Sequence, residues 1–329
     1  MRFTVGEEKA MRRAMVLAAG VRGTTSPNPW VGAVIVPGGY EGATSPPGGP
    51  HAEAIALAAA GMRARGATLV STLEPCCHQG RTAPCTDAIL AAGVRRVVVG
   101  VEDPDPQVRG AGLQVLREAG VDVVVGVCAD DVKAQLAPYL KHRETGRPYV
   151  VLKLAVTMDG RTAAPDGSSR WITGEAARAD AHRLRSECDA VVVGAGTVRA
   201  DDPELTVRAV ATDRQPLRVV LGKAGVDAKV QPAVELWGEP GEVLDELGRL
   251  GVLSAIVEGG ATVAGAFHRA GVVDRYVFYV APALLGGDDG RPVLAGPGVA
   301  TMAEAWRGRI VGVEQMGDDV RIDVLPARA

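Results

Sequence analysis

The sequence is poor in aromatic residues and has no excess of positive charge. Phe, Trp and Tyr make up 4% of the 329 residues, and the formal net charge is -3. Proteins that bind nucleic acids gather Lys and Arg on one face, and single-strand binders also stack bases on aromatic rings. We therefore expect a small-molecule substrate and no nucleic acid among the partners.

Long apolar segments are also absent from the sequence. No apolar run approaches the roughly 18 residues that are needed to cross a bilayer. The N-terminal segment MRFTVGEEKAMRR has neither the apolar stretch nor the cleavage site of a signal peptide. These absences predict a cytoplasmic protein that does not interact with membranes.

Cysteines are few and unevenly distributed. There are five of them, and Cys76, Cys77 and Cys85 lie within ten residues of one another. An odd number without a paired pattern argues against a disulfide framework, and clustered thiols in a reducing compartment favour metal binding. The cluster therefore predicts a metal site.

Length and composition predict a soluble α/β protein of two domains. Hydrophobic residues make up 47% and charged residues 23%, which is typical of folded globular proteins. A chain of 329 residues exceeds one ordinary core. The polar segment 129–148 contains Pro and Gly and predicts a short helix followed by a connection. We therefore expect domains at residues 1–145 and 146–329.

Strand-like and helix-like segments alternate through both halves. Thr4 and Glu7 form a capping-box pattern that predicts a helix through about Ala19. Segment 38–50 reads as a Gly/Pro-rich loop that delivers His51 to the start of a helix. Further strands are expected at 30–36, 67–73, 95–101, 121–127, 148–156, 189–194, 216–221, 253–259 and 275–282. Further helices are expected at 86–93, 112–120, 175–187, 241–250 and 261–270.

The strongest chemical pattern is His51-Ala52-Glu53 followed by two Pro-Cys pairs ending at Cys76 and Cys85. Two thiolates and one imidazole leave the fourth position of Zn²⁺ open for water, whereas a structural zinc site uses four protein ligands. Glu53 is placed to carry a proton from that water to a ring nitrogen and to departing ammonia. The pattern is the signature of zinc nucleobase deaminases with a wider cysteine spacing. The competing interpretation is an ordinary helix-start histidine beside buried thiols.

Two segments carry a family resemblance in this half. LEPCCHQGRTAPC at 73–85 and PNPWVG at 27–32 resemble the bifunctional deaminase–reductase family of riboflavin biosynthesis. The resemblance implies that Cys76 and Cys85 are zinc ligands, that Asn28 holds the pyrimidine and that Arg81 contacts the substrate. Cys77 occupies a position where that family usually has serine.

Segment 37–50 departs from the family, whose members usually have a longer strand-turn-strand there, often with a histidine that faces the substrate. The departure puts the sheet edge and one wall of the pocket in doubt. It leaves an alternative function open, a reductase with an impaired deaminase domain. A nucleic-acid-editing deaminase is disfavoured by the net charge, and a two-domain ligand-binding protein would leave Glu53 without a role.

The second half lacks the G-x-G-x-x-G pattern, because Gly194 and Gly196 are followed by Arg199 at the third glycine position. Residues 253–267 instead read as a strand, two glycines and a helix whose free N–H groups can bind a pyrophosphate. Paired glycines after a strand are also common in plain tight connections. The glycine turn alone is therefore weak evidence for a cofactor.

Four further segments, KLAVTMDGRTA, SRWITGEAAR, GAGTVRADDPELTVR and VEGG, resemble the reductase half of the same family. The resemblance implies an N-terminal cytidine-deaminase-like α/β/α layer and a C-terminal dihydrofolate-reductase-like α/β domain. The NADPH site that it implies consists of Ala155, Trp171, Thr197, Asp201, Gly260, Ala261, Thr262, Val263, Ala264, Gly265 and Ala266. The implied substrate contacts are Ser169, Arg185, Leu205, Arg208 and Glu258.

The implied reaction sequence has two steps. The first is hydrolytic deamination of 2,5-diamino-6-(5-phosphoribosylamino)pyrimidin-4(3H)-one, and the second is NADPH reduction of the ribosyl group to a ribityl chain. Lys153, Asp201 and Glu258 are the polar candidates for handling protons in the second step, and the sequence does not rank them. Reductases of this kind commonly pair through their second domains, so we expect a homodimer or a higher homo-oligomer.

Overall fold

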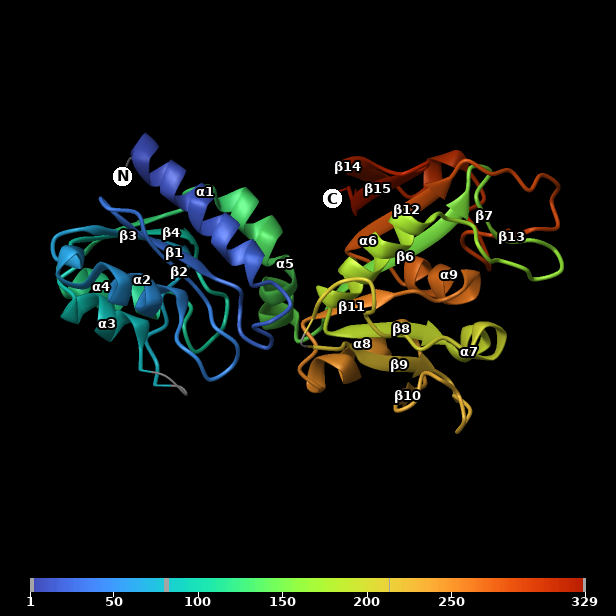
Figure 1. Cartoon of the computed structure of the whole chain (residues 1–329), viewed down its shortest axis with the longest axis horizontal. Helices are drawn as coiled ribbons and strands as arrows, with labels where there is room; N and C mark the ends of the chain where they lie inside the picture. Colours follow the sequence, from blue (N-terminus) through green and yellow to red (C-terminus); the bar gives the residue numbers. More distant parts are fainter. Residues whose placement is uncertain (1–2, 80–82, 213, 328–329) are drawn as a thin grey trace. The chain divides into compact units, whose positions relative to one another are not determined.

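The computed structural model describes residues 3–79, 83–212 and 214–327 (Figure 1). The chain divides into two compact units, Met1–Gly146 and Arg147–Ala329. The division expected from the sequence falls after residue 145. Among the described residues, no helix combines the length and the apolar character that a membrane span requires.

The first unit contains a five-stranded sheet in the order β2-β1-β3-β4-β5. β1 pairs antiparallel with β2 and β3, whereas β3, β4 and β5 are parallel. The strands are β1 (Gly32–Val36), β2 (Tyr40–Ala43), β3 (Thr68–Leu73), β4 (Arg96–Val101) and β5 (Asp122–Val125). The helices are α1 (Val5–Gly20), α2 (Ala52–Ala60), α3 (Cys85–Ala91), α4 (Ala111–Glu118) and α5 (Ala129–Thr145).

Two glycines bring helices onto opposite faces of this sheet. A Cβ on Gly32 would lie 1.9 Å from the Ala14 carbonyl oxygen of α1, and one on Gly42 would lie 2.1 Å from the Ala52 carbonyl oxygen of α2. Gly42 is paired with Ala33, whose side chain points to the face opposite that of Gly32. α1 and α2 therefore enclose the sheet as an α/β/α layer. Because the start of α2 packs against β2, His51, which directly precedes α2, lies close to the sheet.

Two expectations in this unit were wrong. Segment 38–50 is not only a loop, because β2 forms within it and supplies the sheet edge that was in doubt. Gly38 and Gly39 form a turn in which φ is positive, and Gly42 allows α2 to approach β2 closely. The glycines of this segment therefore do not mean that all of it is irregular. The predicted short helix is α5, which spans 17 residues with Pro138 inside it.

The expected capping box is confirmed. Thr4 accepts from the Glu7 amide, and the Glu7 carboxylate accepts from the Thr4 amide, at the start of α1. Such reciprocal bonds satisfy two amide groups that have no partner within the helix.

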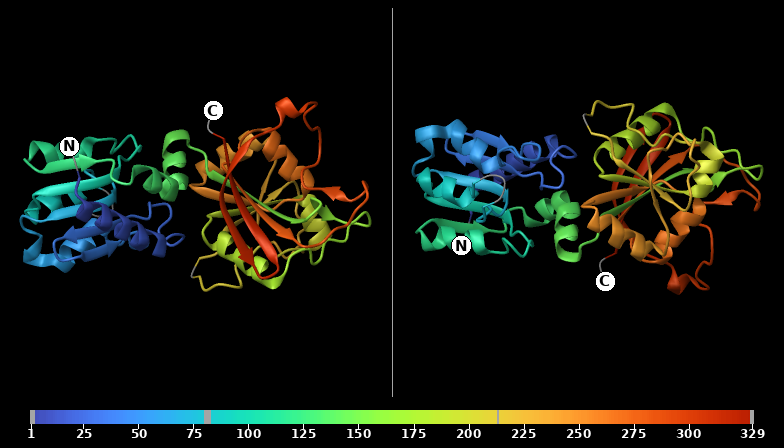
Figure 2. Two further views of the ribbon diagram at one scale, coloured as in Figure 1. Left: turned by 90° about the horizontal axis from the view of Figure 1, so that it is seen from above. Right: turned by 90° about the horizontal axis from the view of Figure 1, so that it is seen from below.

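The second unit has an eight-stranded sheet in the order β10-β9-β8-β11-β6-β12-β15-β14. The pairs from β10 to β12 are parallel, and the hairpin of β14 and β15 adds antiparallel strands at one edge (Figure 2). The strands of this sheet are β6 (Tyr149–Thr157), β8 (Ala190–Gly194), β9 (Leu217–Leu221), β10 (Val234–Leu236), β11 (Ser254–Val257), β12 (Arg275–Ala281), β14 (Gly308–Met316) and β15 (Asp319–Pro326).

Outside this sheet, β7 (Arg161–Ala163) pairs with β13 (Arg291–Pro292). The helices are α6 (Glu175–Ser186), α7 (Ala195–Asp201), α8 (Pro240–Arg249) and α9 (Ala261–Arg269). Apolar side chains of neighbouring strand positions alternate between two clusters, so that Val192 belongs to one and Val191 to the other. Each face of the sheet therefore has its own core, which is typical of a sheet covered on both sides.

Candidate active sites

Three sequence-predicted metal ligands meet at the N-terminal ends of two helices. His51 precedes α2, Cys85 is the first residue of α3, and Cys76 follows β3. The Nδ1 atom of His51 lies 3.5 Å from Cys76 Sγ and 3.3 Å from Cys85 Sγ. Ligands of a tetrahedral Zn²⁺ stand about 3.6 Å apart, which matches these two distances. All three ligand atoms lie within 4.8 Å of one another.

The hydrogen bonds of this cluster favour a thiolate. Hydrogen bonding from the Cys85 thiol, with His51 nearby, lowers the pKa of Cys76 to about 4. The same contact raises the pKa of the Cys85 thiol, and hydrogen bonding to Cys76 raises the pKa of His51. The Cys85 amide also donates to Cys76 Sγ at 3.4 Å, which fixes the ligand in place.

Glu53 lies in the first turn of α2 and lines the same cavity as His51 and Cys76. Its side chain is buried, and burial raises its pKa to about 7. The carboxyl group is thus held next to the metal ligands without being one of them. This is the position that a proton carrier requires.

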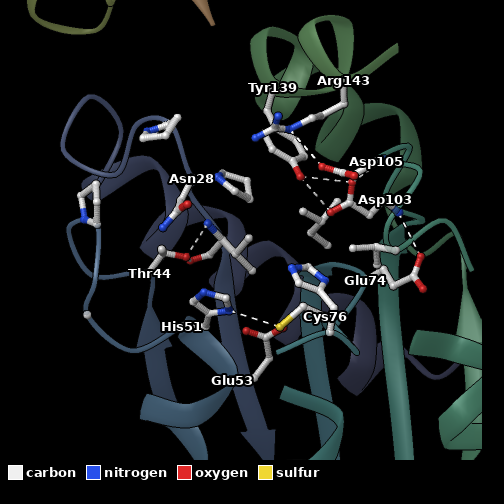
Figure 3. Close-up of a pocket in the computed structure, with 18 of the residues that line it drawn as sticks. Asn28, Thr44, His51, Glu53, Glu74, Cys76, Asp103, Asp105, Tyr139 and Arg143 are labelled. Atoms are coloured by element: carbon white, nitrogen blue, oxygen red, sulfur yellow. Dashed lines mark hydrogen bonds and ion pairs between the residues drawn. The ribbon is translucent and has the colours of Figure 1, made fainter. Parts of the chain in front are cut away.

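The cavity has a volume of about 400 Å³. Figure 3 shows His51, Cys76 and Glu53 at one end, Asn28 and Thr44 along one side, and a cluster from other elements at the opposite end. That cluster consists of Asp103, Asp105, Tyr139 and Arg143. Arg81, which the resemblance places near the substrate, lies outside the described residues.

The residues of this opposite wall were not predicted from the sequence. Asp103 and Asp105 follow the carboxyl end of β4, a position where ligands of open α/β sheets commonly bind, and that signal was present in the sequence. Tyr139 and Arg143 come from α5, four residues apart on one helix face. Tyr139 donates its hydroxyl to the Asp103 carboxylate, at 3.0 Å to Oδ2.

Glu74, also missed, organises the loop between β4 and α4. Its carboxylate oxygens accept from the backbone amides of Asp103, Gly110, Gly112 and Leu113 at 3.0 to 3.2 Å. Four such bonds satisfy a buried carboxylate without a cation. Glu74 therefore positions the wall that carries Asp103.

In the second unit, three predicted residues from three elements form one charged cluster. Glu258 follows β11, and Arg185 of α6 pairs with it through two contacts, Nε to Oε1 at 2.5 Å and Nη2 to Oε2 at 3.0 Å. Lys153 Nζ of β6 lies 3.7 Å from Glu258 Oε2. Burial alone would raise the pKa of Glu258, but the charges of Arg185 and Lys153 lower it to about 2. Burial in turn lowers the pKa of Lys153.

The glycine turn after β11 meets α7. The Gly260 amide donates to Thr197 Oγ1 at 3.3 Å, so two segments of the implied NADPH site are adjacent. The helix α9 that follows presents Ala261 and Thr262 at its accessible start. Farther along, Ala264 belongs to the core, and Gly265 packs against the Ala295 carbonyl, where a Cβ would lie 2.1 Å from the oxygen.

The remaining implied residues make contacts outside this cluster. Asp201 ends α7 and accepts from Arg170 Nη2 through its carbonyl oxygen at 2.7 Å, so its contact is with Arg170 and not with Lys153 or Glu258. Trp171 is 71% exposed, and the guanidinium of Arg178 lies 4.5 Å from its ring centroid.

The segment after α7 reaches Arg185. Arg185 Nη1 donates to the Thr206 carbonyl oxygen at 3.1 Å, beside buried Leu205, whose φ is 55°. Arg208 is exposed and pairs with Glu204 at 2.7 Å. The other four implied residues, Ala155, Ser169, Val263 and Ala266, are half-buried.

Comparisons with known proteins cover both units. The family model described as the RibD C-terminal domain matches residues 148–322. The cytidine and deoxycytidylate deaminase zinc-binding region matches residues 5–101, which include all three candidate zinc ligands. Each unit therefore matches a separate catalytic domain.

Full-length relatives share both units. Riboflavin biosynthesis protein RibD of Escherichia coli (strain K12) is 39% identical over 369 aligned residues, which cover 98% of this chain and 100% of that protein. RibD of Mycobacterium tuberculosis (strain CDC 1551 / Oshkosh) is 45% identical over 336 residues and 97% of each chain. The Escherichia coli alignment is longer than the 329 residues of this chain, so that relative carries segments that are missing here.

Solved structures agree in fold across both units. Acinetobacter baumannii RibD, form 1, has a TM-score of 0.92 at 38% identity and covers 98% of this chain and 99% of its own. A Thermotoga maritima protein, described as a diaminohydroxyphosphoribosylaminopyrimidine deaminase and 5-amino-6-(5-phosphoribosylamino)uracil reductase, has a TM-score of 0.88 at 33% identity, with coverages of 98% and 99%. This chain therefore belongs to the RibD family, the bifunctional deaminase–reductases of riboflavin biosynthesis.

Proposed function

We propose that the first unit deaminates 2,5-diamino-6-(5-phosphoribosylamino)pyrimidin-4(3H)-one and that the second reduces the ribosyl group of the product to a ribityl chain. The observation that carries the proposal is the convergence of His51, Cys76 and Cys85 at the end of a cavity that buried Glu53 also lines. The substrate and order of steps follow those named for the Thermotoga maritima relative.

In the deaminase site, His51, Cys76 and Cys85 would hold Zn²⁺. When bound, this ion supplies a water whose pKa is lowered toward neutrality. Glu53 would carry the two protons of that water one after the other, the first to the ring nitrogen and the second to the amino group that departs as ammonia. Asn28, on the cavity side next to these groups, holds the pyrimidine.

In the reductase site, the accessible start of α9 offers amide N–H groups to the pyrophosphate of NADPH, next to Thr197. When bound, NADPH supplies the hydride. Lys153 is the candidate that carries a proton at its Nζ, because Glu258 remains ionised between two cations. Asp201, which contacts Arg170, would act on the cofactor side and not in that cluster.

The substrate contacts of the reductase follow from the same cluster. Arg185 and Glu258 are fixed by each other, and the segment with Leu205 and Arg208 lies beside Arg185. A guanidinium such as that of Arg208 suits a ribose phosphate because it keeps its charge and can bind two oxygens. Ser169 would complete the site.

The protein would act in the cytoplasm, without nucleic acid, as a homodimer. The long edge strand β14 supports the dimer, because Ile310, Val311 and Val313 are exposed on it and its outer backbone has no neighbouring strand among the described residues. Exposed apolar edges of this kind commonly pair with another chain. Sedimentation should give a dimer for the native protein and a monomer for Val313→Lys; a native monomer would overturn the assignment.

The decisive experiment measures ammonia release from the diaminopyrimidinone ribotide by zinc-quantified protein with NADPH withheld. We expect release in proportion to bound zinc, followed by NADPH oxidation when the cofactor is added. Absence of ammonia from zinc-loaded protein, with NADPH oxidation intact on the deaminated substrate, would instead establish a reductase with an impaired deaminase domain.

A further inference from the structure

The end of the deaminase cavity that lies away from the metal ligands is built by α5. Arg143 and Tyr139 project from this helix, and Asp105 faces them from the loop after β4 (Figure 3). Among the described residues that line the cavity, Arg143 is the one Arg or Lys. The cavity thus has a metal-binding end and an end where one arginine lies beside the carboxyl groups of Asp103 and Asp105.

The guanidinium of Arg143 is held but incompletely hydrogen-bonded. Its Nε is buried and has no hydrogen-bond partner, because Asp105 Oδ2 at 3.4 Å lies in ion-pair range without hydrogen-bond geometry. Asp105 itself accepts from the Gln107 amide through Oδ1 at 3.0 Å. A buried donor without a partner is costly. The Arg143 side chain as a whole is 29% exposed, so a ligand oxygen can reach the outer part of its guanidinium.

The position of Arg143 is set by rigid neighbours. Its guanidinium lies 5.1 Å from the ring centroid of Tyr139, a distance typical of a cation–π contact. Tyr139 is buried and tied to Asp103, which also accepts from the Asp105 amide at 2.9 Å. Arg143 therefore belongs to a built wall, unlike the freely solvated arginines on helix surfaces.

We propose that Arg143 binds the phosphate group of the ribotide during deamination and so selects the phosphorylated substrate. The inference rests on the proposed function and adds a specificity-determining residue to it. With the pyrimidine at His51 and Glu53, the ribose phosphate extends toward the only end of the cavity where a described lining residue carries a permanent positive charge. A guanidinium binds phosphate oxygens through paired, charge-assisted hydrogen bonds.

The test compares ammonia release from the ribotide and from the corresponding riboside, which lacks the phosphate. Arg143→Met should lower kcat/KM for the ribotide about 10- to 100-fold, mainly through KM, and leave kcat/KM for the riboside unchanged. Arg143→Lys should recover part of the loss. The matched control is Arg117→Met, an exposed arginine of α4 outside the cavity, which should behave as the native protein. Equal losses for both substrates would show a purely structural role and overturn the proposal.

A second measurement does not depend on turnover. Phosphorus NMR titration of zinc-loaded Glu53→Gln protein with the ribotide should reveal two phosphate sites, one in each unit, and the double variant with Arg143→Met should keep one. Two sites of unchanged affinity in the double variant would overturn the role of Arg143. Failure of the native protein to release ammonia, with the Arg143-dependent site present, would instead count against the proposed deaminase function.

Discussion

Each unit buries one glutamate at the centre of its site, and the surroundings of the two side chains are opposite in kind. Glu53 lies beside thiols and an imidazole, and burial raises its pKa to about 7. Glu258 has only 7% of its side chain exposed, but Arg185 and Lys153 lower its pKa to about 2. The same residue type is therefore neutralised easily in one unit and is permanently ionised in the other.

The difference assigns two kinds of role. A carboxyl group that can gain a proton near neutral pH can carry one during a reaction, whereas a carboxylate fixed between cations orients them and balances their charge. Glu258 is accordingly a positioning residue for Lys153 and Arg185, and Lys153 becomes the better candidate for moving a proton. Variants at these positions should separate the two roles.

The largest expected effect is that of Glu53→Gln. The amide keeps the shape of the side chain but cannot carry a proton, so kcat for ammonia release should fall about 10³-fold. Zinc content should stay at the native level, because Glu53 is not among the candidate ligands. NADPH oxidation on the deaminated substrate serves as the control and should be unchanged. Native rates of ammonia release from this variant would remove Glu53 from the mechanism.

Replacing the second glutamate should act on stability as well as on activity. Glu258→Gln leaves the largely enclosed Arg185 and Lys153, whose side chains are 14% and 19% exposed, without their counter-charge, which should lower the free energy of unfolding of the second unit by about 3 kcal/mol. Glu53→Gln should not show this loss, since no cation is left unpaired. Denaturant unfolding of both variants measures the contrast, and equal stabilities would mean that the two surroundings do not differ as described.

The role of Lys153 can be separated from its charge. Lys153→Met keeps the length of the side chain but removes the ammonium group, and kcat for NADPH oxidation should fall about 10²-fold. Ammonia release should stay native, because Lys153 belongs to the other unit. Lys153→Arg retains the charge beside Glu258 but holds its protons too tightly to exchange them, so it should rescue stability and not kcat. Full activity of the arginine variant would assign Lys153 a purely electrostatic role.

The zinc cluster could be predicted from the sequence because its chemistry resides in short spacings. His51 and Glu53 are two residues apart, and each cysteine stands next to a proline in a recognisable motif. The opposite wall had no such local signal. Tyr139 and Arg143 reach the cavity only because α5 continues through Pro138, and that continuation depends on tertiary packing of buried Val132 and Leu136.

Composition misled in two places for the same physical reason. Segment 38–50 is rich in Gly and Pro, yet β2 forms there because β1 offers it an edge to pair with. The hairpin of β14 and β15 was not predicted, since β14 has an exposed face of mixed polarity that shows no clear alternation. Pairing between distant strands is a tertiary effect and leaves little trace in local sequence. Likewise, only the structure shows that Asp201 contacts Arg170.

The smallest expected effect concerns a third carboxyl group, Asp103, which has neither the metal ligands of Glu53 nor the cations of Glu258. Burial raises its pKa to about 6 from an ordinary value of 3.8. Between about pH 4 and 6 the folded state therefore holds a proton that the unfolded chain has released, so the contribution of Asp103 to stability falls as the pH rises through this window.

Asp103→Asn removes that titration. The free energy of unfolding of the native protein, measured relative to Asp103→Asn, should decrease by about 2 kcal/mol between pH 4 and pH 7. Taking the difference between two proteins with the same zinc ligands cancels the pH dependence of the metal site itself. Denaturant midpoints at several pH values give the curve. A difference that is independent of pH would mean that the hydrogen bond from Tyr139 and the Asp105 amide outweigh burial, and that Asp103 resembles Glu258 more than Glu53.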